Sequence, residues 1–184
     1  MRVGTGVGDA LREVPVPAPA DAAAMADRLA PAATPGARIP LQQVAQQWLR
    51  DALSLVAGGR VVAFDYGSDT AALASRRWTD WVRTYRSHEL RGHPLQSVGE
   101  LGIMCEIAVD QLSRVRPPER TATQAAWLEQ HGIGELVDEA RAVWTERAHV
   151  GDLVALRARS RVVEAATLLD PGGLGGCRVL EWAG

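Results

Sequence analysis

Apolar residues recur with helical spacing in several segments of this chain. From Leu41 to Val56 they step by three and four positions, which predicts an amphipathic helix that begins at Pro40 and ends at Gly58-Gly59. Asp21 and Asp110 are expected to cap the helices that follow them, and Thr121 with Gln124 has the spacing of a capping box. Further helices are predicted over residues 22–30, 121–131, 133–148 and 153–168.

Short apolar runs between these segments predict strands. Residues 61–64 form a continuous apolar run that follows two glycines, which is typical of a strand buried on both faces in a parallel sheet. Residues 101–109 and 176–182 are predicted strands, and residues 81–86 form a strand or an extended arm. Near the N-terminus, two short runs around Gly4-Thr5-Gly6-Val7-Gly8 predict an antiparallel hairpin. Helices that alternate with strands indicate an α/β fold.

Composition and charge exclude several classes of protein. The chain has 184 residues, 47% of them hydrophobic, and a net charge of −2, so neither a disordered chain nor a generally basic nucleic-acid or membrane binder is expected. The sequence contains no lysine, which excludes Schiff-base and P-loop lysine chemistry. Cys105 and Cys177 are expected to be small buried residues in a reducing compartment. No run of about 18 apolar residues is present and the start does not look like a signal peptide, so a cytoplasmic protein is expected.

Asp65-Tyr66-Gly67 directly follows the predicted strand over residues 61–64. Ligands of α/β sheets bind at the carboxyl ends of strands, so Asp65 could orient a substrate there; a helix cap or turn is the open alternative. The glycine segment at residues 4–8 is better read as a hairpin turn than as a cofactor loop, because too few residues precede it and Pro15 and Pro17 interrupt any helix after it.

Residues 83–93 form a cationic segment that contains three arginines and two histidines. It is either a solvated arm or, with its aromatic side chain, an RNA-binding loop, although the acidic total weakens the second interpretation. His88 and His93 have no third ligand in register, so no metal site is expected.

Taken in order, these segments resemble the C-terminal part of the MidA-like family of SAM-dependent methyltransferases, relatives of the mitochondrial complex I assembly arginine methyltransferase. Asp65-Tyr66-Gly67 is similar to the end of the family's "Ile-Asp-Tyr-Gly" strand, and residues 83–88 are similar to its Arg-x-Tyr-Arg-x-His arm. The resemblance extends over about residues 36–182. The matching segments are 59–67, 83–88, 94–99, 108–110, 123–133 and 174–180.

The resemblance implies a partial class I methyltransferase (Rossmann-like) sheet with flanking helices and an N-terminal antiparallel hairpin. Residues 1–35 would be an insertion-like hairpin with a short helix, and residues 36–184 the C-terminal half of the α/β domain. It also implies S-adenosylmethionine as cofactor and methyl transfer to a side-chain nitrogen, arginine in known members. The site residues that it implies are Asp65 and His88 for catalysis and Asp65, Tyr66, Gly67, Arg83, Tyr85 and Gln124 around the cleft.

The family's glycine loop for S-adenosylmethionine does not match any segment of this sequence. The chain is therefore expected to be a truncated or separately encoded half, whose partners are a protein substrate or the missing N-terminal half, and neither nucleic acid nor a membrane. A non-catalytic protein-binding module is the alternative. The strand over residues 61–64 is expected to lie at an open sheet edge, which would promote homo-oligomers or aggregation.

Overall fold

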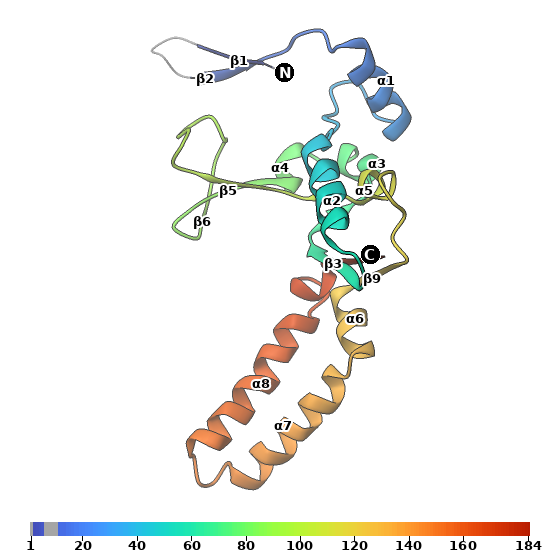
Figure 1. The fold of residues 1–184 in the computed structure, drawn as a ribbon. Helices are drawn as coiled ribbons and strands as arrows, with labels where there is room; N and C mark the ends of the chain where they lie inside the picture. Colours follow the sequence, from blue (N-terminus) through green and yellow to red (C-terminus); the bar gives the residue numbers. More distant parts are fainter. Residues whose placement is uncertain (1, 6–10) are drawn as a thin grey trace. The chain divides into compact units, whose positions relative to one another are not determined.

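The computed structural model describes residues 2–5 and 11–184. The chain forms two compact units: Met1–Leu49 with Gly67–Val115, and Arg50–Tyr66 with Arg116–Gly184 (Figure 1). Each unit combines helices with short sheets, which confirms the mixed α/β class. The predicted domain boundary after residue 35 stays a prediction.

Among its described residues, the first unit contains three small sheets and four short helices, and it includes the beginning of α2. Its elements are β1 (Arg2–Thr5), β2 (Leu11–Val14), α1 (Ala20–Leu29), α2 (Gln43–Leu55), β4 (Gly67–Ser68), α3 (Thr70–Ala74), α4 (Trp78–Trp81), β5 (Val82–Arg86), β6 (Glu89–Arg91), β7 (Gly102–Cys105), β8 (Ile107–Ala108) and α5 (Val109–Ser113).

The N-terminal hairpin is confirmed, because β1 and β2 pair antiparallel with Arg2 opposite Val14. The glycine turn predicted between the two strands includes residues 6–10, which lie outside the described residues. Asp21 was a wrong prediction for the cap of α1. The helix begins at Ala20 after Pro19, whose carbonyl accepts from the Ala23 amide at 2.9 Å, so Asp21 lies in the first turn.

The single strand predicted over residues 101–109 is wrong, because two strands with different partners replace it. β7 pairs antiparallel with β5, whereas β8 pairs parallel with β4. The break falls at Glu106, whose amide donates to the Trp81 carbonyl at 2.9 Å and whose carboxylate binds Arg76 at 2.6 Å. Cys105, at the end of β7, is exposed rather than buried.

A buried network of hydrogen bonds around Gln111, which is 1% exposed, links several segments of the first unit. Its Oε1 accepts from the Gln42 amide at 2.8 Å, and its Nε2 donates to the Pro40 carbonyl at 2.7 Å and to Thr70 Oγ1 at 2.9 Å. Thr70 in turn donates through its amide and hydroxyl to Asp110 Oδ1, both at 2.8 Å. Asp110 therefore binds the start of α3, and the prediction that it caps α5 is wrong.

The same network explains why α2 begins at Gln43 and not at Pro40. The Gln42 side chain donates to the Glu106 carbonyl at 2.7 Å and accepts from the Ala108 amide at 2.7 Å. The Gln42 side chain and the Pro40 carbonyl thus form hydrogen bonds with residues 106–111, and the helix begins only after them.

The second unit is built on one three-stranded sheet. Besides the end of α2, its elements are β3 (Arg60–Asp65), β9 (Arg120–Thr123), α6 (Gln124–Gln130), α7 (Ile133–Arg147), α8 (Leu153–Leu169), the 3-10 helix η2 (Leu174–Gly176) and β10 (Arg178–Ala183).

β10 lies between β3 and β9 and is antiparallel to both, so that Glu181 stands opposite Val62 and Arg120. β3 is not the doubly buried parallel strand that its apolar run predicted. It is at the edge of the sheet, and Val62 and Phe64 are 38% and 44% exposed. The expectation of an open edge is therefore confirmed among the described residues.

The core of this unit centres on β10. Trp182 is fully buried, and its Nε1 donates to the Arg116 carbonyl at 2.8 Å. Helix α6 is capped by Thr123, whose hydroxyl accepts from the Ala126 amide at 3.2 Å. The capping box predicted from Thr121 is wrong, because Thr121 lies in strand β9 and pairs with Leu180 of β10.

Candidate functional site

The candidate site of the second unit lies where β3 and β9 end on either side of the start of β10. Since β3 and β9 are both antiparallel to β10, their carboxyl ends lie at the same end of the sheet, which we call the Asp65 edge. There Asp65 stands opposite Arg178, and Arg178 stands opposite Thr123. Asp65 and Arg178 are both exposed at this edge, so the structure places a carboxylate and a guanidinium where a ligand could reach them.

Asp65, Tyr66 and Cys177 interact at this edge. Asp65 Oδ1 accepts from the Tyr66 amide at 2.7 Å. Partial desolvation raises the pKa of the Asp65 carboxyl, and this hydrogen bond only partly opposes it, although the residue as a whole remains exposed. Burial likewise raises the pKa of the Cys177 thiol; a side-chain hydrogen bond with Tyr66 lowers it and the Asp65 charge raises it. The raised pKa keeps the Cys177 thiol protonated, and a thiol is a much weaker nucleophile than a thiolate.

The raised pKa of Asp65 predicts a pH-dependent stability effect. Because the folded state holds this proton more tightly than the unfolded state, the ionised carboxylate lowers stability as pH rises above its ordinary pKa of 3.8. Asp65→Asn is therefore expected to raise Tm at pH 7, and the difference should disappear at pH 3, where wild-type Asp65 is protonated in both states. Thermal unfolding followed by circular dichroism at both pH values measures this.

Asp152→Asn is the matched control with the opposite sign. The Arg147 guanidinium and the Ala155 amide hold the pKa of Asp152 below its usual value. Asp152 therefore stabilises the folded state above its unfolded pKa, and its replacement should lower Tm at pH 7 but not after that carboxyl is protonated. Equal shifts for both variants at pH 7 would contradict the assignment for Asp65.

Gln124 also belongs to this edge, although its side chain is 8% exposed. The backbone N–H of Gln124 donates to the Cys177 carbonyl at 2.8 Å, and its side-chain Nε2 donates to the Leu168 carbonyl at 3.0 Å. These bonds join the start of α6 to the end of α8 and to Cys177 after η2, so Gln124 has a structural role in the second unit.

The remaining predicted site residues lie in the first unit. Arg83 and Tyr85 are on β5, and His88 is in the two-residue turn that joins β5 to β6. Ser87 and His88 both have positive φ, 51° and 67°, as a tight hairpin turn requires. Gly67 forms β4 and pairs with Ile107. The structure thus groups Asp65, Tyr66 and Gln124 in one unit, and the hairpin residues in the other.

Sequence reasoning missed a buried carboxylate on the sheet. Glu181 is 4% exposed and accepts from Trp127 Nε1 at 2.8 Å and from Arg60 at 3.2 Å, with Arg120 at 3.6 Å. The Trp127 ring also stacks on His131 at 3.7 Å. The available signal was an acidic residue inside the otherwise apolar strand of residues 179–182.

The groups exposed at this edge include a carboxylate and an aromatic ring. Asp65 offers an acceptor for hydroxyl or amine hydrogens, and Tyr66, 39% exposed, offers an aromatic surface. Gly4 and Thr5 of the glycine segment lie in the hairpin strand β1. The next element among the described residues is the strand β2, not a helix. Across residues 2–5 and 11–184, no three His, Cys, Asp or Glu side chains are placed to hold a metal ion.

Comparison with known proteins decides the family. Residues 4–126, more than half of the chain, match the model of the family described as "Putative S-adenosyl-L-methionine-dependent methyltransferase". The chain belongs to this family. The match includes the Asp65-Tyr66-Gly67 edge and the β5–β6 hairpin. No curated protein matches the sequence.

Two solved structures from Burkholderia thailandensis have the fold of this methyltransferase family member. One is a COG1565 superfamily member bound to S-adenosyl-homocysteine, with TM-score 0.77 and 18% identity over 99% of this chain and 46% of its own. The other is an uncharacterized COG1565 superfamily protein, with TM-score 0.75 and 17% identity over 99% of this chain and 48% of its own. This chain therefore spans about half the length of either neighbour.

No helix within the described residues has the length and apolar character needed to cross a lipid bilayer. The predicted cytoplasmic location stays a prediction.

Proposed function

We propose that this chain acts in S-adenosylmethionine-dependent methyl transfer to a side-chain nitrogen of a protein, arginine being the acceptor in the MidA-like relatives that it resembles. The family match over residues 4–126 is the observation that carries the proposal. The likeness to a neighbour that binds S-adenosyl-homocysteine supports it.

Bound S-adenosylmethionine supplies a methyl group on a positively charged sulfur. Transfer of that methyl group would leave S-adenosyl-homocysteine, and it would require residues of the protein to position the acceptor nitrogen in line with the methyl carbon and to take up the proton that the nitrogen loses. Asp65 is our candidate for this proton because its carboxyl group is exposed at the sheet edge and its pKa is raised. His88 is the second candidate, and Arg83 and Tyr85 are proposed to hold the acceptor segment.

The adenosyl pocket is proposed to be shared with a second polypeptide segment. This chain spans less than half of each neighbour, and β3 leaves the edge of its sheet open for another strand. The same observations support the alternative, in which this chain is a non-catalytic module that retains a protein-binding face.

Calorimetric titration with S-adenosylmethionine tests the proposal. We expect the chain alone to bind with a dissociation constant above about 1 mM, and binding to become micromolar when the polypeptide encoded directly upstream is co-purified with it. Asp65→Asn should then reduce transfer of radiolabelled methyl groups to protein at least about tenfold, whereas Asp27→Asn on the exposed side of α1 should not.

Three results would change the proposal. Micromolar binding by the chain alone would contradict the shared pocket, but not the activity. Absence of binding by the combined polypeptides would overturn the methyltransferase and leave the binding module. Full methyl transfer by the Asp65→Asn variant would remove Asp65 from the catalytic assignment.

A further inference from the structure

The β5–β6 hairpin of the first unit (Figure 1) has a cavity of about 300 Å³ at its base. The cavity is lined by α4, by β5 and β6, and by the residues that directly follow β6. Its apolar wall includes Trp78, Val82 and Leu90, and its cationic wall includes Arg83 and Arg91. Small-ligand pockets enclose about 300–1,000 Å³, so this cavity, which we call the hairpin pocket, has room for one or two peptide side chains.

The aromatic wall of the hairpin pocket is held in place by its neighbours. The Arg38 guanidinium lies over the Trp78 ring, 4.4 Å from its centroid, and the His93 ring meets Trp78 edge to face at 5.3 Å. Glu13 accepts from both terminal nitrogens of Arg38, and His93 Nδ1 accepts from the Leu95 amide at 3.2 Å. A wall that is already ordered costs little conformational entropy when a ligand binds to it.

The base of the hairpin pocket is also fixed, whereas one side of it is open. Thr84 is 2% exposed, and its hydroxyl donates to the Gly92 carbonyl at 2.6 Å, which joins β5 to the segment after β6. Leu90 lines the pocket but is 65% exposed. The pocket therefore presents apolar surface to solvent beside a rigid base, and an apolar ligand group would cover that surface.

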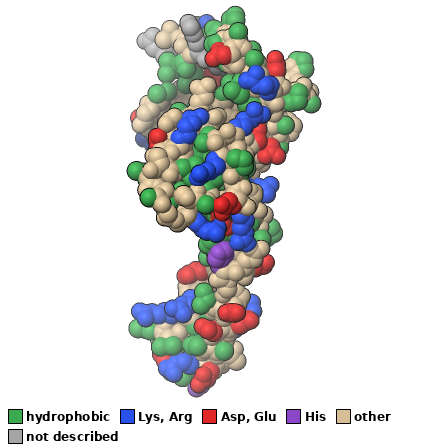
Figure 2. Space-filling model, turned by 45° about the vertical axis from the view of Figure 1, so that its right-hand side comes forward, with side chains coloured by type: hydrophobic (Ala, Val, Ile, Leu, Met, Phe, Trp, Pro, Cys, Tyr) green, Lys and Arg blue, Asp and Glu red, His purple; other side chains and the backbone are tan. Residues whose placement is uncertain are grey.

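Arg83 is a cation of the hairpin pocket without an acidic partner among the described residues. Its guanidinium donates to the Asp80 carbonyl, at 3.5 Å, whereas Arg91 is bound to the Glu89 carboxylate. On the face shown in Figure 2, acidic and basic side chains are interspersed, and no surface of one sign extends across it. A single arginine of this kind favours one anionic group, and the guanidinium geometry matches a carboxylate.

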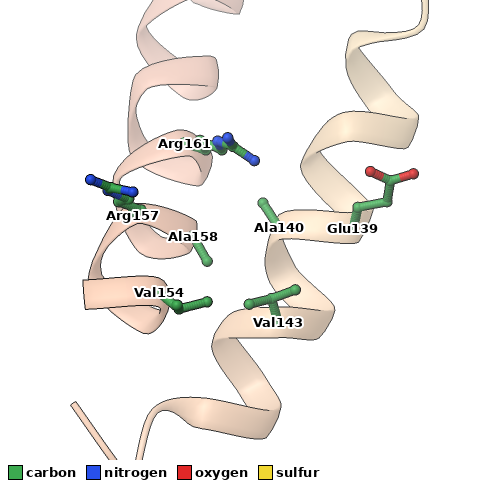
Figure 3. A pocket seen from close by; sticks show the side chains of 7 residues that line it. All are labelled: Glu139, Ala140, Val143, Val154, Arg157, Ala158 and Arg161. Carbon is green, nitrogen blue, oxygen red and sulfur yellow. The ribbon is translucent and has the colours of Figure 1, made fainter. Parts of the chain in front are cut away.

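The groove between α7 and α8 in the second unit also encloses about 300 Å³, but its lining differs (Figure 3). Glu139 lines it on α7, so an acidic ligand would be repelled there. The apolar side chains of this groove are small or aliphatic, namely Ala140, Val143, Val154 and Ala158. Of the two cavities, the hairpin pocket is the one that combines an aromatic wall and a cation with a lining free of carboxylates.

We propose that the hairpin pocket recognises the acceptor protein by a pair of neighbouring residues. A large apolar side chain fills the space against Trp78 and Leu90, and the carboxylate of an adjacent acidic residue binds Arg83. This inference rests on the proposed methyl transfer and specifies its substrate class, a protein segment with an acidic residue beside a large apolar one. His88 lies in the turn at the other end of the same hairpin, so recognition and proton uptake would use different ends of it.

Titration of the full chain with the peptide acetyl-Gly-Asp-Phe-Gly-amide, followed by two-dimensional NMR without S-adenosylmethionine, tests the pocket. The indole N–H signal of Trp78, assigned from Trp78→Phe, should shift with a dissociation constant of about 1 mM or less. The same peptide with Asn in place of Asp should bind at least about fivefold more weakly, because it lacks the charge that Arg83 pairs with.

Arg83→Gln tests the carboxylate contact directly. This variant should bind the Asp peptide at least about fivefold more weakly than the wild type and should no longer distinguish the Asp peptide from the Asn peptide. Arg28→Gln, an exposed arginine on α1 of the same unit, is the matched control and should retain the full preference. Equal preference for the Asp peptide in the Arg83→Gln variant would overturn the assignment of Arg83.

Leu90→Ser tests the apolar contact. It should weaken the Asp-Phe peptide at least about threefold and leave a peptide with Ser in place of Phe unaffected, while circular dichroism stays the same because Leu90 is largely exposed. Absence of any shift of the Trp78 signal would overturn the pocket. Selective peptide binding without methyl transfer by the combined polypeptides would support the pocket and overturn only the proposed activity; methyl transfer without selective peptide binding would do the reverse.

Discussion

Replacement of Trp182 by alanine is expected to lower the free energy of unfolding by about 3–5 kcal/mol, the usual cost of removing a large aromatic side chain from a core. Trp182 is fully buried in the central strand β10 of the second unit. The change also leaves the Arg116 carbonyl without the Trp182 Nε1 donor, which lies 2.8 Å away. A loss of this size is a large fraction of the stability of a small domain.

Urea denaturation followed by far-ultraviolet circular dichroism measures the loss. Trp182→Phe is the control, because it retains most of the buried volume and removes only the hydrogen bond; it should cost about 1 kcal/mol beyond the small change in packing. If the alanine and phenylalanine variants were equally stable, the packing of Trp182 would not be the main stabilising contribution.

Gln111→Leu is expected to destabilise the first unit by about 2–4 kcal/mol, although leucine is similar in size and more hydrophobic. The amide of Gln111 bonds to the Gln42 N–H, the Pro40 carbonyl and the Thr70 hydroxyl, at 2.7–2.9 Å. Leucine cannot satisfy these buried groups, and each unsatisfied group carries its own desolvation cost.

The control for this change is Gln46→Ala. Gln46 Nε2 reaches Gln111 Oε1 only at 3.4 Å, so its loss should cost less than about 1 kcal/mol. Both variants are compared with the wild type in the same urea titration. A Gln111→Leu protein as stable as the wild type would show that water replaces the amide.

The sequence predicted the long helices well because helical periodicity is local. The predicted helix over residues 133–148 corresponds to α7 (Ile133–Arg147), and residues 153–168 correspond to α8 (Leu153–Leu169). Strand pairing was not predictable in the same way. β3 and β10 are separated by more than a hundred residues, and an apolar run such as residues 61–64 does not specify whether its partner is parallel, antiparallel or absent.

The candidate site was predicted in part for the same reason. Local sequence placed Asp65 at the end of a strand, which the structure confirms. The neighbours Cys177 and Arg178 depend on the register of β10, and Gln111 and Glu181 depend on partners far away in the sequence. Polar residues of this kind are recognisable only once the groups that satisfy them are known.

The central position of β10 also determines when the second unit can fold. β3 and β9 do not pair with each other, and the strand that joins them, Arg178–Ala183, is synthesised after both. During translation, residues 60–65 must therefore wait, with their backbone groups exposed, for the ribosome to complete more than a hundred further residues. This nascent segment is where we expect chaperones to be required in the cell.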